Sequence, residues 1–235
     1  MSYAPLHRSP EQTRVLEAVL ATAAPGKVIV LDLDGCLFDA RNRQVHILRE
    51  YGARFDVPAL YRVQEQHFTS WLLPETFEAA GIDPGLAEPL QDFWFERFFS
   101  GEYCVFDHAM PGAVAFVRKL HNTGAEVVYL TGRHREMHEG TEAALRRAGF
   151  PYDLPRTRLI TKPQIEIPDA EFKGRALETI AQLGHVVAFM DNEPTNVNLF
   201  HAMHPEALVV WLDTDHSPRP VRPVASLPRI KGFLM

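Results

Sequence analysis

Three apolar stretches of this sequence each run directly into side chains that could bind a metal ion, a phosphate or a proton. The side chains that follow them are Asp32 and Asp34, Thr131, and Asp191. Carboxylate oxygens are hard ligands of the kind that Mg²⁺ prefers. Buried carboxylates are strongly disfavoured without a compensating cation, so we expect a metal ion or a lysine beside them.

The apolar stretches themselves are typical of strands buried on both faces, because they are short, continuous and rich in β-branched residues. They cover residues 28–31, 127–130, 186–190 and 208–212. Helical periodicity lies between them. This alternation predicts right-handed crossovers and a doubly wound α/β fold, in which a parallel sheet is covered by helices on both sides. Ligands bind beyond the carboxyl ends of such strands, where these side chains would lie.

One segment, residues 41–104, breaks the alternation. It has helical patterning interrupted by proline and glycine, no strand signal, and half of the Phe, Tyr and Trp residues of the chain. We expect it to be a helical cap inserted after the first strand, with residues 1–40 and 105–235 forming the α/β core. The aromatic residues either build the core of this small lobe or, in part, line a substrate pocket. The proline-rich residues 215–228 are expected either to wrap the core surface or to be partly mobile.

The overall charge and the cysteine content exclude several classes of function. A formal net charge of −6 argues against binding to extended nucleic acid or to an anionic membrane, but is compatible with a small anionic ligand. The two cysteines, Cys36 and Cys104, are too few for a disulfide scaffold and fit a reducing compartment. Without a signal peptide or a transmembrane run, we expect a cytoplasmic protein; the sequence leaves the oligomeric state open.

The order of these motifs resembles the haloacid dehalogenase superfamily, in the phosphatase branch that carries a helical cap. The resemblance covers approximately residues 27–200. It rests on an apolar strand into Asp32-Leu33-Asp34-Gly35, a second strand into Thr131, a lysine, and a third strand into Asp191. It implies a Mg²⁺-dependent phosphomonoester hydrolase that acts on a small soluble phosphate ester.

The resemblance also implies roles for the three aspartates. Asp32 would attack phosphorus and form an aspartyl phosphate, and Asp34 would act first as general acid and then as general base. Mg²⁺ would be held by the carboxylates of Asp32 and Asp191 and by the backbone carbonyl of Asp34. One aspartate must be ionised while the other holds a proton, so we expect metal and lysine to stabilise charge on Asp32 more than on Asp34.

The resemblance also implies roles for a threonine, a lysine, an arginine and two glycines. Thr131 would donate to a phosphoryl oxygen. The lysine is predicted to be Lys173, near a helix start, in preference to Lys162, which precedes a proline. Arg133 would contact phosphate or substrate, or else form a salt bridge with a surface acid. The residues expected at the substrate are Gly35, Gly132 and Arg133.

One position departs from the family pattern, since Asn192 follows Asp191 where many members have a second acid. Either Glu193 supplies that carboxylate or Asn192 replaces it with a neutral group, while Asn196 is either an outer partner of the site or a helix-turn cap. A phosphomutase acting on a sugar phosphate would use the same residues. The alternative of a different class is a non-catalytic binding or scaffold protein on this fold.

Overall fold

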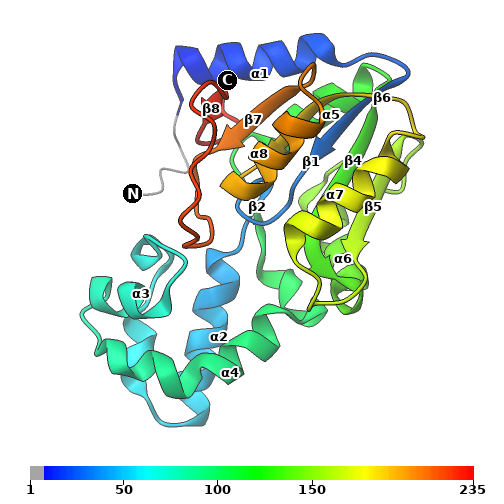
Figure 1. The fold of residues 1–235 in the computed structure, drawn as a ribbon. Coiled ribbons are helices and arrows are strands. Elements are labelled where there is room, and N and C mark those ends of the chain that lie inside the picture. Colours follow the sequence, from blue (N-terminus) through cyan, green and yellow to red (C-terminus); the bar gives the residue numbers. More distant parts are fainter. Residues whose placement is uncertain (1–7) are drawn as a thin grey trace.

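A six-stranded, wholly parallel sheet lies at the centre of the protein in a computed structural model that describes residues 8–235 (Figure 1). The strand order is β5-β4-β1-β6-β7-β8. The strands are β1 (Lys27–Leu31), β4 (Glu126–His134), β5 (Thr157–Lys162), β6 (His185–Asp191), β7 (Leu208–Leu212) and β8 (Arg229–Ile230). The predicted α/β fold class is confirmed.

Helices cover both faces of this sheet, because its strands present apolar side chains alternately to either side. Ile29 and Leu31 of β1 pack with α1, α5 and α6, whereas Val28 and Val30 pack with α7 and α8. These helices are α1 (Pro10–Thr22), α5 (Ala113–Asn122), α6 (His138–Ala148), α7 (Asp169–Ile180) and α8 (Pro194–Met203). The two apolar layers hold the strand ends in fixed relative positions.

Residues 41–106 form a helical insertion between the strands of a short antiparallel hairpin, β2 (Phe38–Asp39) and β3 (His108–Ala109). Its α-helices are α2 (Arg41–Arg54), α3 (Leu73–Ala79) and α4 (Ala87–Phe98), and its 3₁₀ turns cover Pro58–Arg62, Glu65–His67, Pro84–Leu86 and Gly101–Phe106. The insertion has its own apolar cluster, which includes Leu48, Phe77 and Leu90. Figure 1 shows these helices together, apart from the two layers that cover the sheet.

Besides the hairpin strands β2 and β3, two strands of the main sheet and one connection differ from the sequence expectation. β5 was missed because Thr157–Lys162 mixes charged and apolar residues, as suits an edge strand. β8 has only two residues and pairs with β7. Residues 213–219, here called the tail strap, do not simply wrap the surface but bond to loops beside the sheet edge. Within residues 8–235, no helix is long and apolar enough to cross a membrane.

Candidate active site

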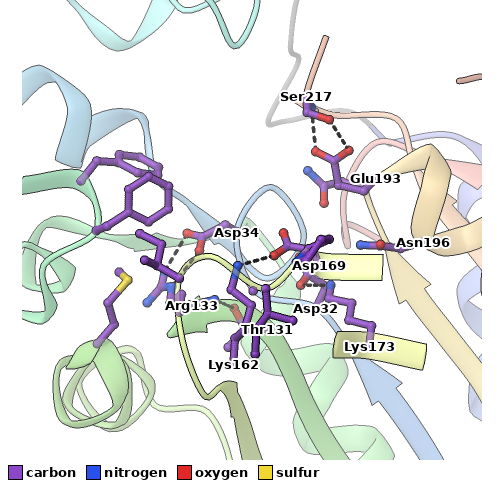
Figure 2. Close-up of a pocket in the computed structure, with 18 of the residues that line it drawn as sticks. Asp32, Asp34, Thr131, Arg133, Lys162, Asp169, Lys173, Glu193, Asn196 and Ser217 are labelled. Atoms are coloured by element: carbon purple, nitrogen blue, oxygen red, sulfur yellow. Dashed lines mark hydrogen bonds and ion pairs between the residues drawn. The ribbon is translucent and has the colours of Figure 1, made fainter. Parts of the chain in front are cut away.

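Three neighbouring strands bring the predicted side chains to one edge of the sheet (Figure 2). Asp32 follows the last residue of β1, Asp191 is the last residue of β6, and Thr131 lies in β4. β1 runs between the other two strands. The Asp32 backbone N–H donates to the Met190 carbonyl at 2.9 Å, which ties the two aspartate-bearing strand ends together.

A buried lysine joins two of these aspartates. Lys173 Nζ lies 2.6 Å from Asp32 Oδ1 and 2.7 Å from Asp191 Oδ2. Burial raises the pKa of Asp32 well above its ordinary value, Lys173 opposes this rise and Asp191 adds to it. Burial alone would lower the pKa of Lys173, but Asp191 and Asp32 together raise it. One positive charge thus faces two buried carboxylates, which leaves room for a further cation.

The competing lysine, Lys162, lies in the same cavity but makes a different ion pair. Its Nζ is 2.7 Å from Asp169 Oδ1, and no contact joins it to Asp32 among the described residues. The Asp169 carboxylate fills the space above Gly132, where an added Cβ would lie 2.6 Å from Oδ2. A side chain at position 132 would displace the Asp169 carboxylate from this position. Lys173 rather than Lys162 contacts Asp32.

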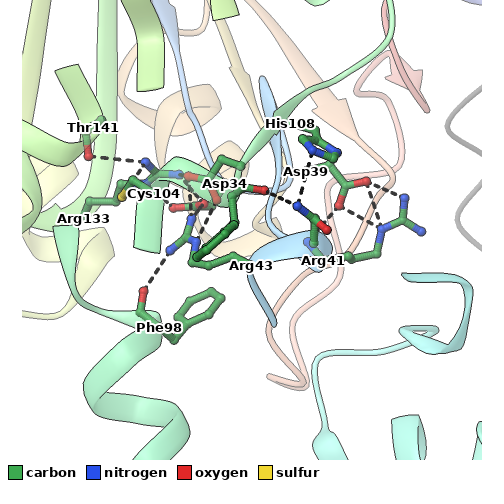
Figure 3. Close-up of polar contacts among 12 residues, drawn as sticks. Asp34, Asp39, Arg41, Arg43, Phe98, Cys104, His108, Arg133 and Thr141 are labelled. Atoms are coloured by element: carbon green, nitrogen blue, oxygen red, sulfur yellow. Dashed lines mark hydrogen bonds and ion pairs between the residues drawn. The ribbon is translucent and has the colours of Figure 1, made fainter. Parts of the chain in front are cut away.

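The second aspartate, Asp34, is held by two arginines (Figure 3). Arg133 donates to both of its carboxylate oxygens at 2.7 Å, and Arg43 of α2 donates to Oδ1 at 2.8 Å. Both arginines also bind the buried carboxylate of Asp107 at 2.7 Å. The four side chains form a neutral cluster, here called the arginine clamp. Although burial opposes it, the arginines lower the pKa of Asp34.

The arginine clamp adds contacts that the sequence did not predict. The two arginines favour the ionised form of Asp34; the predicted charge order, which depends on Mg²⁺ and Lys173 together at Asp32, stays a prediction. Arg133 pairs with buried acids rather than with a surface acid. Arg43 and Asp107 were missed, because a single arginine or aspartate in the sequence gives no sign of which distant carboxylate or guanidinium it will meet.

Asn192 and Glu193 were the two candidates for the position where many family members have a second acid, and the contacts around Asp191 show where the Glu193 carboxylate lies. The Glu193 N–H donates to Asp191 Oδ1 at 2.8 Å, while the Glu193 carboxylate accepts from the Ser217 N–H and hydroxyl at 2.6 and 2.7 Å. Asn196 Nδ2 lies 3.2 and 3.1 Å from the two oxygens of Asp191. Asn196 and Lys173 thus both hold the Asp191 side chain, and the Glu193 carboxylate instead anchors the tail strap.

Gly35 lies beside the tail strap and does not line the cavity that contains Asp32. Its φ is +71°, and a Cβ there would lie 2.2 Å from Asn192 Nδ2 and 2.8 Å from the carbonyl oxygen of Asp215. Asn192 Nδ2 donates to that same carbonyl, and the Thr214 hydroxyl donates to the Gly35 carbonyl. Gly35 is therefore required by backbone packing; the structure does not place it at the substrate position that the sequence analysis predicted.

A cavity of about 350 Å³ opens at this sheet edge. Its polar lining includes Asp32, Thr131 and Lys173, and its apolar lining includes Phe95 and Phe99 of the insertion and Ile165 and Ile167 between β5 and α7. The Thr131 hydroxyl oxygen accepts from the Arg133 N–H at 3.2 Å, so its own hydrogen remains available to a ligand. The volume lies within the range of small-molecule sites.

The side chains at this site provide some, but not all, of the ligands that a divalent cation needs. Asp32 and Asp191 offer hard oxygen ligands and both contact Lys173, and the buried Asn196 Oδ1 has no hydrogen-bond partner within residues 8–235. The Asp34 carboxylate is held in the arginine clamp, and the described chain contains no group of three or more His, Cys, Asp or Glu side chains that could hold a metal ion. Any third protein ligand would have to be a backbone or amide oxygen, as predicted for Asp34.

Comparison with known proteins finds solved structures that are similar in fold to this chain. No family model matches the sequence, and no curated protein matches it. Among solved structures, a candidate phosphatase from Clostridium difficile is 12% identical, with a TM-score of 0.56 over 80% of this chain and 85% of its own. A haloacid dehalogenase superfamily hydrolase of subfamily IA from Geobacter sulfurreducens is 16% identical, with a TM-score of 0.54 over 90% and 94% of the two chains.

A third neighbour, protein tyrosine kinase A of Mycobacterium tuberculosis, is 18% identical, with a TM-score of 0.55 over 88% of this chain and 93% of its own. The chain therefore has the fold of haloacid dehalogenase-like hydrolases, as the motif resemblance implied. Its neighbours carry names for different activities, and a fold hosts chemistry through its site rather than by its topology. The activity of this chain therefore depends on the chemistry of Asp32 and the residues around it.

Proposed function

We propose that this protein is a Mg²⁺-dependent phosphomonoester hydrolase of the haloacid dehalogenase superfamily. The observation that carries the proposal is the contact of Lys173 with both Asp32 and Asp191, at the ends of adjacent strands and beside Thr131. This arrangement combines a nucleophilic carboxylate, a positive charge and a hydroxyl donor in one small cavity. Those are the groups that an in-line attack on phosphorus requires.

In the first step, an oxygen of Asp32 attacks phosphorus, the bond from phosphorus to the ester oxygen breaks, and an aspartyl phosphate forms. Oδ2 is the available oxygen, since Oδ1 is bonded to Lys173. Lys173 and the Thr131 hydroxyl stabilise the charge on the phosphoryl oxygens. Mg²⁺ held by Asp32, Asp191 and the Asp34 carbonyl would add positive charge there.

In the second step, water attacks phosphorus and gives its proton to a base, the bond from phosphorus to the Asp32 oxygen breaks, and inorganic phosphate and the free Asp32 carboxylate form. Asp34 in the arginine clamp is ionised, which is the form suited to that step. Donating a proton to the leaving alcohol requires the other form, so Asp34 must loosen its bonds to Arg43 and Arg133 during the first step. Movement of the insertion that carries Arg43 would remove one of these two arginines from Asp34, and we propose that the insertion acts as a cap.

Release of inorganic phosphate from a panel of small phosphate esters tests the proposal. Mg²⁺-dependent release by the wild type, abolished by chelation and reduced at least 10³-fold by Asp32→Asn, is the expected result. Asp92→Asn is the matched control, since Asp92 is an exposed carboxylate of the insertion that does not line the cavity. If the wild type releases no phosphate from any ester with Mg²⁺ present, the hydrolase proposal is wrong.

The arginine clamp is the specific observation that favours the second candidate, a non-catalytic binding protein. With Asp34 held by two guanidinium groups, such a protein would bind phosphate but not turn it over. Thermal stabilisation by phosphate with Mg²⁺, without release from any ester, would support it. A phosphomutase would instead be activated by a bisphosphorylated sugar and return the phosphoryl group to substrate.

A further inference from the structure

Helix α4 has two apolar faces, and only one of them is used by the core of the insertion. Leu90 and Trp94 belong to the apolar cluster of the insertion. Phe95, near the end of α4, and Phe99, one helical turn later, have ring centroids 4.7 Å apart and line the cavity that contains Asp32. Phe95 is 46% exposed. Folding of the insertion does not account for an exposed aromatic ring at this position.

Two further rings extend this surface. Trp71 and Phe98 line the same cavity, with centroids 5.8 Å apart in an edge-to-face arrangement. The Arg43 guanidinium lies 4.6 Å from the Phe98 centroid and fixes that ring from the side of the arginine clamp. We call Trp71, Phe95, Phe98 and Phe99 the aromatic wall. One cavity of about 350 Å³ thus joins an aromatic wall to the carboxylates, lysine and hydroxyl of the candidate site.

We propose that the aromatic wall binds a flat aromatic ring, so that the substrate class is phosphate monoesters whose alcohol part carries such a ring. This inference rests on the proposed function for the position of the phosphate, which lies beside Asp32. Ring faces and edges pair favourably with one another at centroid distances of 4.5–7 Å. An aliphatic alcohol of the same size would bury similar apolar area but would gain none of that pairing.

Binding of a phosphonate tests the aromatic wall without requiring turnover, because its carbon–phosphorus bond is not an ester. We expect benzylphosphonate to bind at least tenfold more tightly than heptylphosphonate, a ringless compound with the same number of carbons, in calorimetry with Mg²⁺ present. Phe95→Leu should weaken benzylphosphonate about threefold to tenfold and leave heptylphosphonate unchanged. Phe55→Leu is the matched control, because Phe55 is 50% exposed on the same insertion and does not line the cavity.

Tryptophan fluorescence gives an independent readout that does not depend on the Phe95 variant. Benzylphosphonate should change the emission of the wild type, and Trp71→Phe should remove most of that change while keeping a ring in the wall. Two arms identify the ring: turnover of benzyl phosphate against heptyl phosphate, two esters of primary alcohols with equal carbon number, and of adenosine 5′-monophosphate against ribose 5-phosphate. Preference for the ringed member of either pair supports the inference and assigns a simple aryl group or a nucleobase.

The two proposals fail separately. Ringed phosphonates that bind tightly to a protein without phosphatase activity would support the aromatic wall and overturn the hydrolase. Phosphate release with equal use of ringed and ringless esters, and equal affinity for the two phosphonates, would support the hydrolase and overturn the aromatic wall. Equal effects of Phe95→Leu and Phe55→Leu on benzylphosphonate would likewise overturn it.

Discussion

Lys173 and Lys162 show at the level of single residues why position matters more than residue type. Both are buried lysines that pair with aspartate in one cavity. Lys173 contacts two carboxylates that are almost fully enclosed, whereas the Asp169 side chain that pairs with Lys162 is 36% exposed. Solvent can therefore compensate the loss of Lys162 but not the loss of Lys173.

This difference predicts unequal effects of the same substitution. Lys173→Met removes the lysine that contacts both Asp32 and Asp191, so it should lower the free energy of unfolding by about 3–5 kcal/mol unless those carboxylates take up protons or a metal ion. It should also reduce phosphate release by about 10²-fold or more. Lys162→Met should cost about 1 kcal/mol or less. Urea denaturation and turnover of both variants would measure this, and equal losses would contradict the roles assigned to the two lysines.

At the level of elements, the sequence predicted the strands that are apolar throughout and the residues that directly follow them. Asp32, Thr131 and Asp191 were predictable because each ends a buried run, and strand ends of a parallel sheet meet at one edge. The edge strand β5 and the tail strap were not, because their positions depend on hydrogen bonds to distant segments. The Ser217 bonds to Glu193 have no signal in the local sequence.

The tail strap carries an aspartate whose protonation should affect stability. Burial raises the pKa of Asp215 to about 6. Because the folded value exceeds the unfolded value of about 3.9, the associated stability is fully present below about pH 4 and is lost as pH rises through 6. Asp215→Asn should therefore raise the free energy of unfolding at pH 7 by about 1–3 kcal/mol relative to wild type, with little gain at pH 4.

Urea denaturation of both proteins at several pH values between 4 and 7 would test this dependence. Asp92→Asn, on an exposed face of α4, is the control and should follow the wild type at every pH. A stability gain from Asp215→Asn that is equal at pH 4 and pH 7 would show that the gain comes from a source other than the titration of Asp215.

At the level of the whole molecule, the arginine clamp joins the insertion to the sheet. Arg43 comes from α2 of the insertion and is fully buried, and it bonds to Asp34 beyond β1, to Asp107 before β3, and to the Phe98 carbonyl at the end of α4. One side chain thus connects the aromatic wall, the hairpin and the proposed acid–base residue. If the insertion moves away from the sheet, either these hydrogen bonds break or the partner residues move with Arg43.

A double-mutant cycle would measure that connection. Arg43→Met leaves Asp34 and Asp107 facing Arg133 alone, and we expect a loss of about 3–5 kcal/mol in the free energy of unfolding. Adding Asp107→Asn restores a balanced pair of Asp34 with Arg133, so the double variant should be more stable than the sum of the single losses by about 1–3 kcal/mol. Additive losses in urea denaturation would mean that Arg43 contributes by packing against Phe98 rather than by balancing the buried charges, and that the insertion is not held to the sheet by the arginine clamp.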